Sequence, residues 1–184
     1  KTILDHHFAP GSIDVNIMTK IDKDNFIDDE QLPVIYNDAH AALRGFVNST
    51  TNSSVIFSAG MNPRLYGYME SFNEFYPNTN GQFQKIIVLK VSDFSSEMIQ
   101  GNFLAKKGLW VSEYRIESGL NCGGHAFATD GFLLGPILEE FKNKKDELIQ
   151  SAYSLFTNAL ASKNKEVPNE QPALKITVPG GVGT

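Results

Sequence analysis

The stretch Lys85-Ile86-Ile87-Val88-Leu89-Lys90-Val91 decides the fold class. Its nearly continuous apolar character predicts a strand that is covered on both faces, as strands of parallel sheets are. Further strands are predicted at 13–18, 55–58, 109–116 and 174–178, with helices between them at 31–47, 62–75, 94–106 and 133–160, the last one broken near 143–146. Strands that alternate with helices in this way indicate an α/β fold with a parallel sheet.

Length, composition and charge narrow the class of protein. The chain has 184 residues, of which 41% are hydrophobic and 20% charged, so we expect a single α/β domain over 1–184. The alternative is that this domain is a fragment of a larger barrel protein. A net charge of -5 argues against a nucleic-acid partner. No apolar run reaches the roughly 18 residues of a membrane span. The single cysteine, Cys122, excludes an internal disulfide and favours a cytoplasmic protein.

The segment Gly119-Leu120-Asn121-Cys122-Gly123-Gly124-His125-Ala126-Phe127 carries the most chemical information. Glycines let a backbone approach a ligand closely, and histidine exchanges protons near neutral pH. A second diglycine, Gly180-Gly181, follows the predicted strand at 174–178. Two units of strand and glycine turn predict a small phosphate-bearing ligand at the ends of parallel strands.

The order of these motifs resembles the central portion of nitronate monooxygenases, which are enzymes with flavin mononucleotide (FMN) on a (β/α)8 barrel. The matching segments are 14–18, 57–63, 88–92, 119–125 and 178–182. Two residues depart from the family pattern, because Asn121 replaces its usual glutamate and Cys122 its alanine. The first barrel unit and the final two have no counterpart here. The resemblance implies a TIM-type barrel, or a large part of one.

The resemblance also implies roles for individual residues. His125 would be the general base that removes a proton from a carbon acid next to a nitro group, with FMN as the oxidant. Lys90 would place positive charge beside the pyrimidine end of the flavin, and Asn16 would hydrogen-bond the flavin edge. The backbone that approaches the flavin ring and phosphate would belong to Gly123, Gly124, Gly180 and Gly181. Asn16, Gly60, Lys90, His125 and Gly180 should then lie on one rim of the sheet.

Each of these residues also has a structural interpretation. His125 and Asn16 could satisfy turns, the glycines could serve turn geometry, and Lys90 could be a solvated strand end. Cys122 and His125 could bind a metal or act as a thiol and its base, but zinc needs three or four ligands, so no metal site is predicted. The alternative function is a non-catalytic or phosphate-ligand-binding barrel domain that keeps the motif backbone. Unpaired strand edges predict an oligomer or a remaining part of the barrel as partner.

Overall fold

A single parallel sheet organises the chain. The structure, a computed structural model, describes residues 13–18, 22–58, 60–117 and 134–178. Its sheet contains, in spatial order, β1 (Val15–Ile17), β4 (Ser54–Phe57), β5 (Ile86–Val91), β6 (Val111–Ile116) and β7 (Lys175–Thr177). All four neighbouring pairs are parallel, and the spatial order is the order along the chain. The predicted α/β class, the parallel strands and the positions of these five strands are confirmed.

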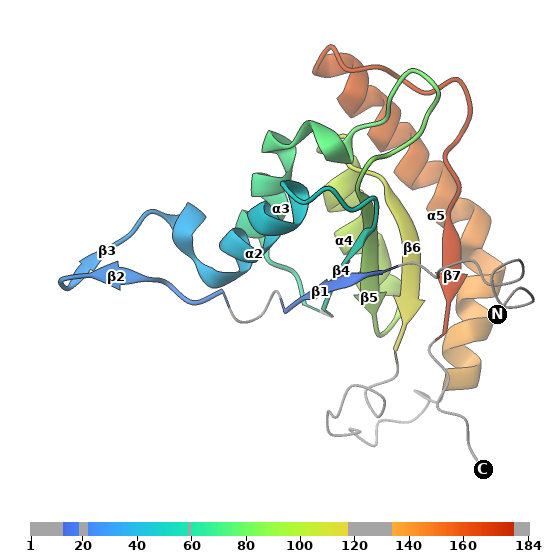
Figure 1. The fold of residues 1–184 in the computed structure, drawn as a ribbon. Helices are drawn as coiled ribbons and strands as arrows, with labels where there is room; N and C mark the ends of the chain where they lie inside the picture. Colours follow the sequence, from blue (N-terminus) through green and yellow to red (C-terminus); the bar gives the residue numbers. More distant parts are fainter. Residues whose placement is uncertain (1–12, 19–21, 59, 118–133, 179–184) are drawn as a thin grey trace, which may run out of the picture.

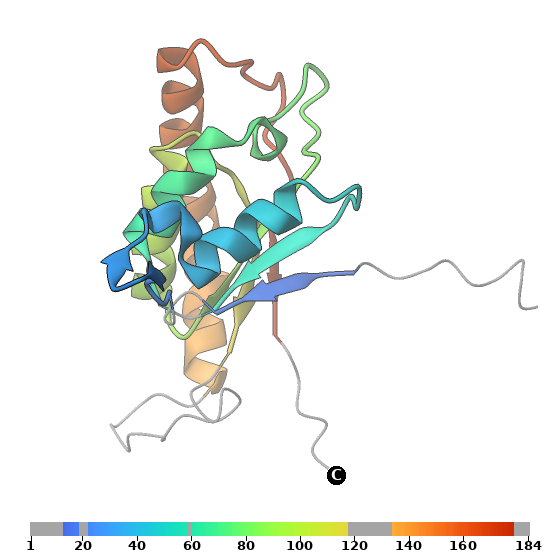
Figure 2. The ribbon, with the colours of Figure 1, turned by 60° about the vertical axis from the view of Figure 1, so that its left-hand side comes forward.

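The helices that connect these strands cover one face of the sheet (Figures 1 and 2). They are α2 (Asp38–Val47), α3 (Pro63–Tyr68), α4 (Phe94–Ala105) and α5 (Leu134–Ser162), with short 3-10 helices η1 (Val34–Tyr36), η2 (Met69–Ser71) and η3 (Asn73–Phe75). Alternate strand residues point into the core between sheet and helices, among them Val55, Phe57, Ile87 and Leu89. Of the helices in the described ranges, none combines the length and apolarity needed to cross a bilayer.

Helix α4 lies against β6 because one of its residues has no side chain. A Cβ atom on Gly101 would lie 2.1 Å from the Tyr114 hydroxyl oxygen, so only glycine fits here. The N-cap residue Asp93 accepts a hydrogen bond from the backbone N–H of Ser96, at 2.7 Å, which fixes the start of the helix after β5. The predicted helix at 94–106 is therefore confirmed and differs by one residue at its end.

The helix predicted at 31–47 is wrong in its first part. Instead, β2 (Phe26–Ile27) and β3 (Glu30–Gln31) form an antiparallel hairpin, and α2 begins only at Asp38. Pro33 disfavours helical geometry in the residue before it, which keeps the chain extended there. Asn37, with φ −60° and ψ 152°, then sets the helix start.

Two other predicted helices also differ. The break expected near 143–146 is absent, because α5 is continuous from Leu134 to Ser162. Two ion pairs between residues one turn apart stabilise helical structure through the polar stretch where a break was expected. They join Lys142 with Glu139 and Lys144 with Glu140. The helix predicted at 62–75 ends as α3 at Tyr68 and continues as two 3-10 helices, because Phe72 between them adopts extended backbone angles.

Candidate functional site on the helix-free face of the sheet

The sheet face that none of the described helices covers, the helix-free face, carries polar side chains around two buried apolar ones, Ile56 and Val88. The strand register places Asn16, Ile56, Val88, Glu113 and Lys175 in one row across the five strands. The next row toward the carboxyl ends contains Lys90, Arg115 and Thr177. Because side chains alternate along a strand, both rows lie on the face opposite the core.

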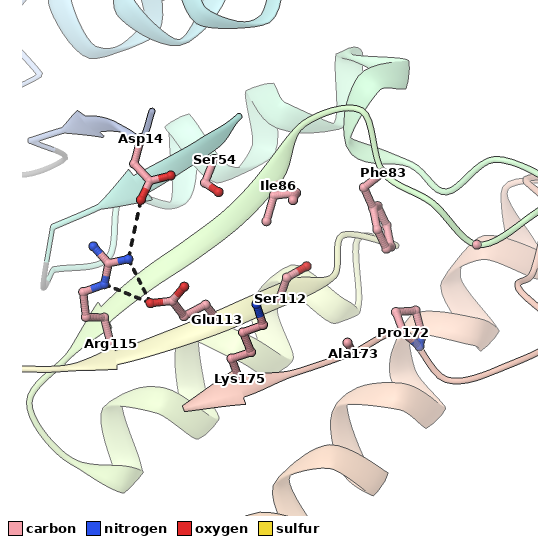
Figure 3. A pocket seen from close by; sticks show the side chains of 11 residues that line it. Asp14, Ser54, Phe83, Ile86, Ser112, Glu113, Arg115, Pro172, Ala173 and Lys175 are labelled. Carbon is pink, nitrogen blue, oxygen red and sulfur yellow. Dashed lines mark hydrogen bonds and ion pairs between the residues drawn. The ribbon is translucent and has the colours of Figure 1, made fainter. Parts of the chain in front are cut away.

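This face is concave. Arg115 of β6 and Asp14, just before β1, lie 3.6 Å apart between Nη2 and Oδ2 (Figure 3). The two strands are three inter-strand spacings apart, which is about 14 Å in a flat sheet. The Arg115 side chain therefore reaches across two intervening strands toward Asp14. The cavity beside this ion pair, lined by residues from or next to all five strands, shows that this face is hollowed.

A hydrogen-bond network lies on this face. Arg115 donates from Nε and Nη2 to Oε1 of Glu113, at 3.0 and 2.8 Å, and the Thr177 hydroxyl donates to the same oxygen at 2.6 Å. Burial alone would raise the pKa of Glu113, but the hydrogen bonds from Thr177 and Arg115 outweigh it and lower that pKa. The carboxylate therefore stays ionised and ties β6 to β7, while Arg115 also reaches Asp14 beside β1.

A cavity of about 440 Å³ adjoins the network at the amino ends of the strands (Figure 3). Phe83, Ile86 and Pro172 form apolar walls. The Asp14 Oδ1 atom is buried without a hydrogen-bond partner. Parallel α/β proteins bind ligands at the carboxyl ends of their strands, so this cavity lies at the end opposite the predicted site. We call the cavity and the network together the floor, which extends from the amino ends of the strands up to the row that contains Lys90.

An ion pair lies nearer the carboxyl ends. Lys90 of β5 and Glu117, directly after β6, are 2.9 Å apart between Nζ and Oε2, and their side chains are only 18% and 12% exposed. The Glu117 backbone N–H donates to the Val91 carbonyl at 2.9 Å, which extends the pairing of β5 with β6. Sequence reasoning missed Glu117. No local pattern in the sequence marks it, because its contact with Lys90 depends on the register of β5 against β6.

The structure places two of the predicted site residues on one face of the sheet, on strands that are separated by β4. Asn16 and Lys90 lie on the same helix-free face, with Lys90 one row closer to the carboxyl ends. His125 and the four glycines, Gly123, Gly124, Gly180 and Gly181, lie outside the described residues, as does Cys122. Among the described residues, no group of three or more histidine, cysteine, aspartate or glutamate side chains could hold a metal ion.

Removing the arginine of the floor should destabilise the protein. Arg115→Met leaves two partly buried carboxylates, Asp14 and Glu113, without their shared cation, which should lower the free energy of unfolding by about 1–3 kcal/mol at pH 7. The lowered pKa of Glu113 stabilises the fold above its ordinary value of 4.5, and this contribution is lost as pH falls through the lowered value. Urea unfolding from pH 3 to 7 measures both. The exposed Lys142→Met is the control, and an equal loss in it would contradict the assignment.

Comparisons with known proteins return no match to a family model, a curated protein or a solved structure.

Proposed function

We propose that this protein is a flavin-dependent oxidoreductase resembling nitronate monooxygenases, built on a (β/α)8 barrel or a large part of one. The supporting observation is the Lys90–Glu117 ion pair on the helix-free face, at the carboxyl ends of β5 and β6. In the chain, the glycine-rich segment 119–125 follows Glu117 after one residue. The positive charge of Lys90, which Glu117 balances, therefore lies at the end of the strand after which the chain continues into the segment that contains the proposed base, His125.

The shape of the sheet supports the barrel. A barrel wall needs parallel strands whose spatial order follows the chain, helices on the outer face and a concave inner face lined by side chains. The five described strands agree with these requirements in their order and direction, and the side chains of Asp14, Glu113, Arg115 and Thr177 lie on the hollowed face opposite the helices.

The described residues fit the proposed cofactor at two positions. The Lys90 ammonium has three N–H donors, and the ion pair with Glu117 uses one of them. The others can donate to an acceptor on the flavin edge. The Asn16 amide, which is exposed on the same face, can donate and accept. FMN, when bound, would supply the oxidising power. In this proposal His125 removes the proton from a carbon acid, and a histidine is suited to this because its pKa lies near neutral pH.

Replacing the rim lysine should weaken cofactor binding. In the Lys90→Met variant the dissociation constant for FMN should rise about tenfold, because a charge-assisted hydrogen bond contributes on the order of 1.5 kcal/mol. Titration of the protein into FMN, followed by quenching of flavin fluorescence, measures the constant. Lys142→Met, on the exposed side of α5, should bind like the wild type. FMN binding that is unchanged in Lys90→Met would remove Lys90 from the site.

A non-catalytic domain that binds a phosphate-bearing ligand is the second candidate. Glu117 favours it, because a carboxylate 2.9 Å from Lys90 neutralises the charge that the flavin chemistry would use. The replacement of the family's glutamate by Asn121 also favours it. This candidate predicts binding of FMN or another phosphate ester without turnover of carbon acids.

A further inference from the structure

An ordered arm projects from the sheet between β1 and α2 (Figure 1). The arm comprises residues 22–38, with the β2–β3 hairpin at its tip and η1 at its base. Its polar groups bond within the arm, since Leu32 N donates to Asn25 O at 2.8 Å and the Asn25 side-chain amide donates to Tyr36 O at 2.7 Å. The arm is therefore a built element, although a two-stranded hairpin is only marginally stable alone.

The arm leaves its apolar side chains uncovered. Phe26 is 58% and Ile27 60% exposed at the tip, and Val34, Ile35 and Tyr36 are exposed near the base. Three acidic residues follow these two along the hairpin, Asp28 and Asp29 in its turn and Glu30 opposite Ile27 on β3. Asp28 and Asp29 have positive φ angles of 47° and 65°, a conformation that glycine adopts at lower cost. An apolar surface with an acidic rim fits an apolar surface that carries a lysine.

The outer surface of α4 has this complementary character. An open surface hollow of about 400 Å³, the α4 groove, lies along one side of this helix and is lined by Met98, Ile99, Asn102, Phe103 and Lys106. Ile99 is 63% exposed, so the groove is not covered by the described parts of the chain. The arm and the groove are both exposed in one copy. The arm combines apolar side chains with negative charge, and the groove combines apolar side chains with the positive charge of Lys106. Reciprocal exchange between two copies would cover both and close the assembly at a dimer.

We propose that the arm of one copy docks into the α4 groove of a second copy, and the reverse, in a twofold homodimer. Phe26 and Ile27 enter the groove beside Ile99 and Phe103, and the acidic tip approaches Lys106. Each copy contributes one arm and one groove, so the dimer contains two equivalent contacts. This inference does not depend on the proposed flavin chemistry.

Analytical ultracentrifugation of the full chain over a range of concentrations tests the dimer. The wild type should dimerise, and the dissociation constant should rise at least about tenfold in Phe26→Ser/Ile27→Ser and in Ile99→Gln. Val167→Ser removes another apolar residue, 44% exposed, and should leave the constant unchanged. Lys106→Glu should weaken the dimer, and adding Glu30→Lys should restore it. Circular dichroism confirms that each variant folds.

Mixing the variants distinguishes arm-to-groove docking from other dimers. Alone, the arm variant Phe26→Ser/Ile27→Ser and the groove variant Ile99→Gln each lack both contacts. In a mixture, the intact arm of the groove variant can enter the intact groove of the arm variant, so mixed dimers with one contact should form. A monomeric wild type, a groove variant that dimerises as tightly as the wild type, or a mixture that dimerises no more tightly than either variant alone would each overturn the proposal.

Discussion

Replacing the proposed base, His125→Asn, should lower turnover of a carbon acid by roughly 10²-fold or more, the scale expected for the loss of a general base. Asparagine is smaller than histidine and still forms hydrogen bonds, so folding and FMN binding should persist. Asparagine cannot accept the proton, so a group with a pKa near that of imidazole should also disappear from the pH profile of kcat/KM. Steady-state kinetics with a nitroalkane over pH 5–9, normalised to bound flavin, measure both effects.

The matched control is His7→Asn, which removes a histidine from outside the motif. It should turn over like the wild type. If His125 only satisfies a turn, its replacement should change stability by about 1 kcal/mol and leave turnover per flavin-loaded molecule intact. That outcome would remove the catalytic role and leave the binding interpretation.

Replacing one buried glutamate, Glu97→Gln, should stabilise the protein by about 1–3 kcal/mol at pH 7. Glu97 of α4 is fully buried, and neither of its carboxylate oxygens has a hydrogen-bond partner. Burial raises its pKa to about 9, so the folded protein holds this group protonated at neutral pH. In the unfolded chain the same group ionises near 4.5. Glutamine has a similar shape and no charge, so it removes the cost of keeping the proton.

The pH dependence gives this prediction a second readout. Because the pKa of Glu97 is higher in the folded than in the unfolded protein, keeping this group protonated costs no stability below about 4.5, and the free energy of unfolding falls as pH rises from about 4.5 toward about 9. The slope from this group approaches 1.4 kcal/mol per pH unit between these values. Denaturant unfolding from pH 4 to 9 should show the decline in the wild type and a flatter profile in Glu97→Gln. The exposed Glu139→Gln should follow the wild type, and a Glu97→Gln profile parallel to the wild type would contradict the assignment.

The sequence predicted the sheet well because strand signals are local. The apolar stretch at 85–91 forms β5, and each of the other four predicted strands lies within two residues of its observed bounds. Helix boundaries were harder, because they depend on contacts that are distant in sequence. Asn37 Nδ2 donates to Asp24 Oδ1 at 2.6 Å, a contact that fixes the arm and delays α2. No periodic pattern in the sequence encodes it.

The candidate site was predictable only in part. Alternation along the strands is sufficient to place Lys90 and Asn16 on one face. The partner of Lys90 required the register of β5 against β6, which includes a shift between Ile87 and Val88. A sequence alone does not reveal such an irregularity. The floor network escaped prediction for the same reason, since Asp14 and Arg115 are distant in sequence and meet only through the pairing of four strands.

The absorption spectrum of the purified, FMN-incubated protein during anaerobic addition of a nitroalkane distinguishes a flavin-dependent oxidoreductase from a non-catalytic domain. We expect flavin absorption bands that stay with the protein after removal of free FMN and that bleach when the carbon acid is added. The His125→Asn variant should keep the bands and bleach at least about 10²-fold more slowly. A protein without bound flavin, or bound flavin that the carbon acid never bleaches, would contradict the account.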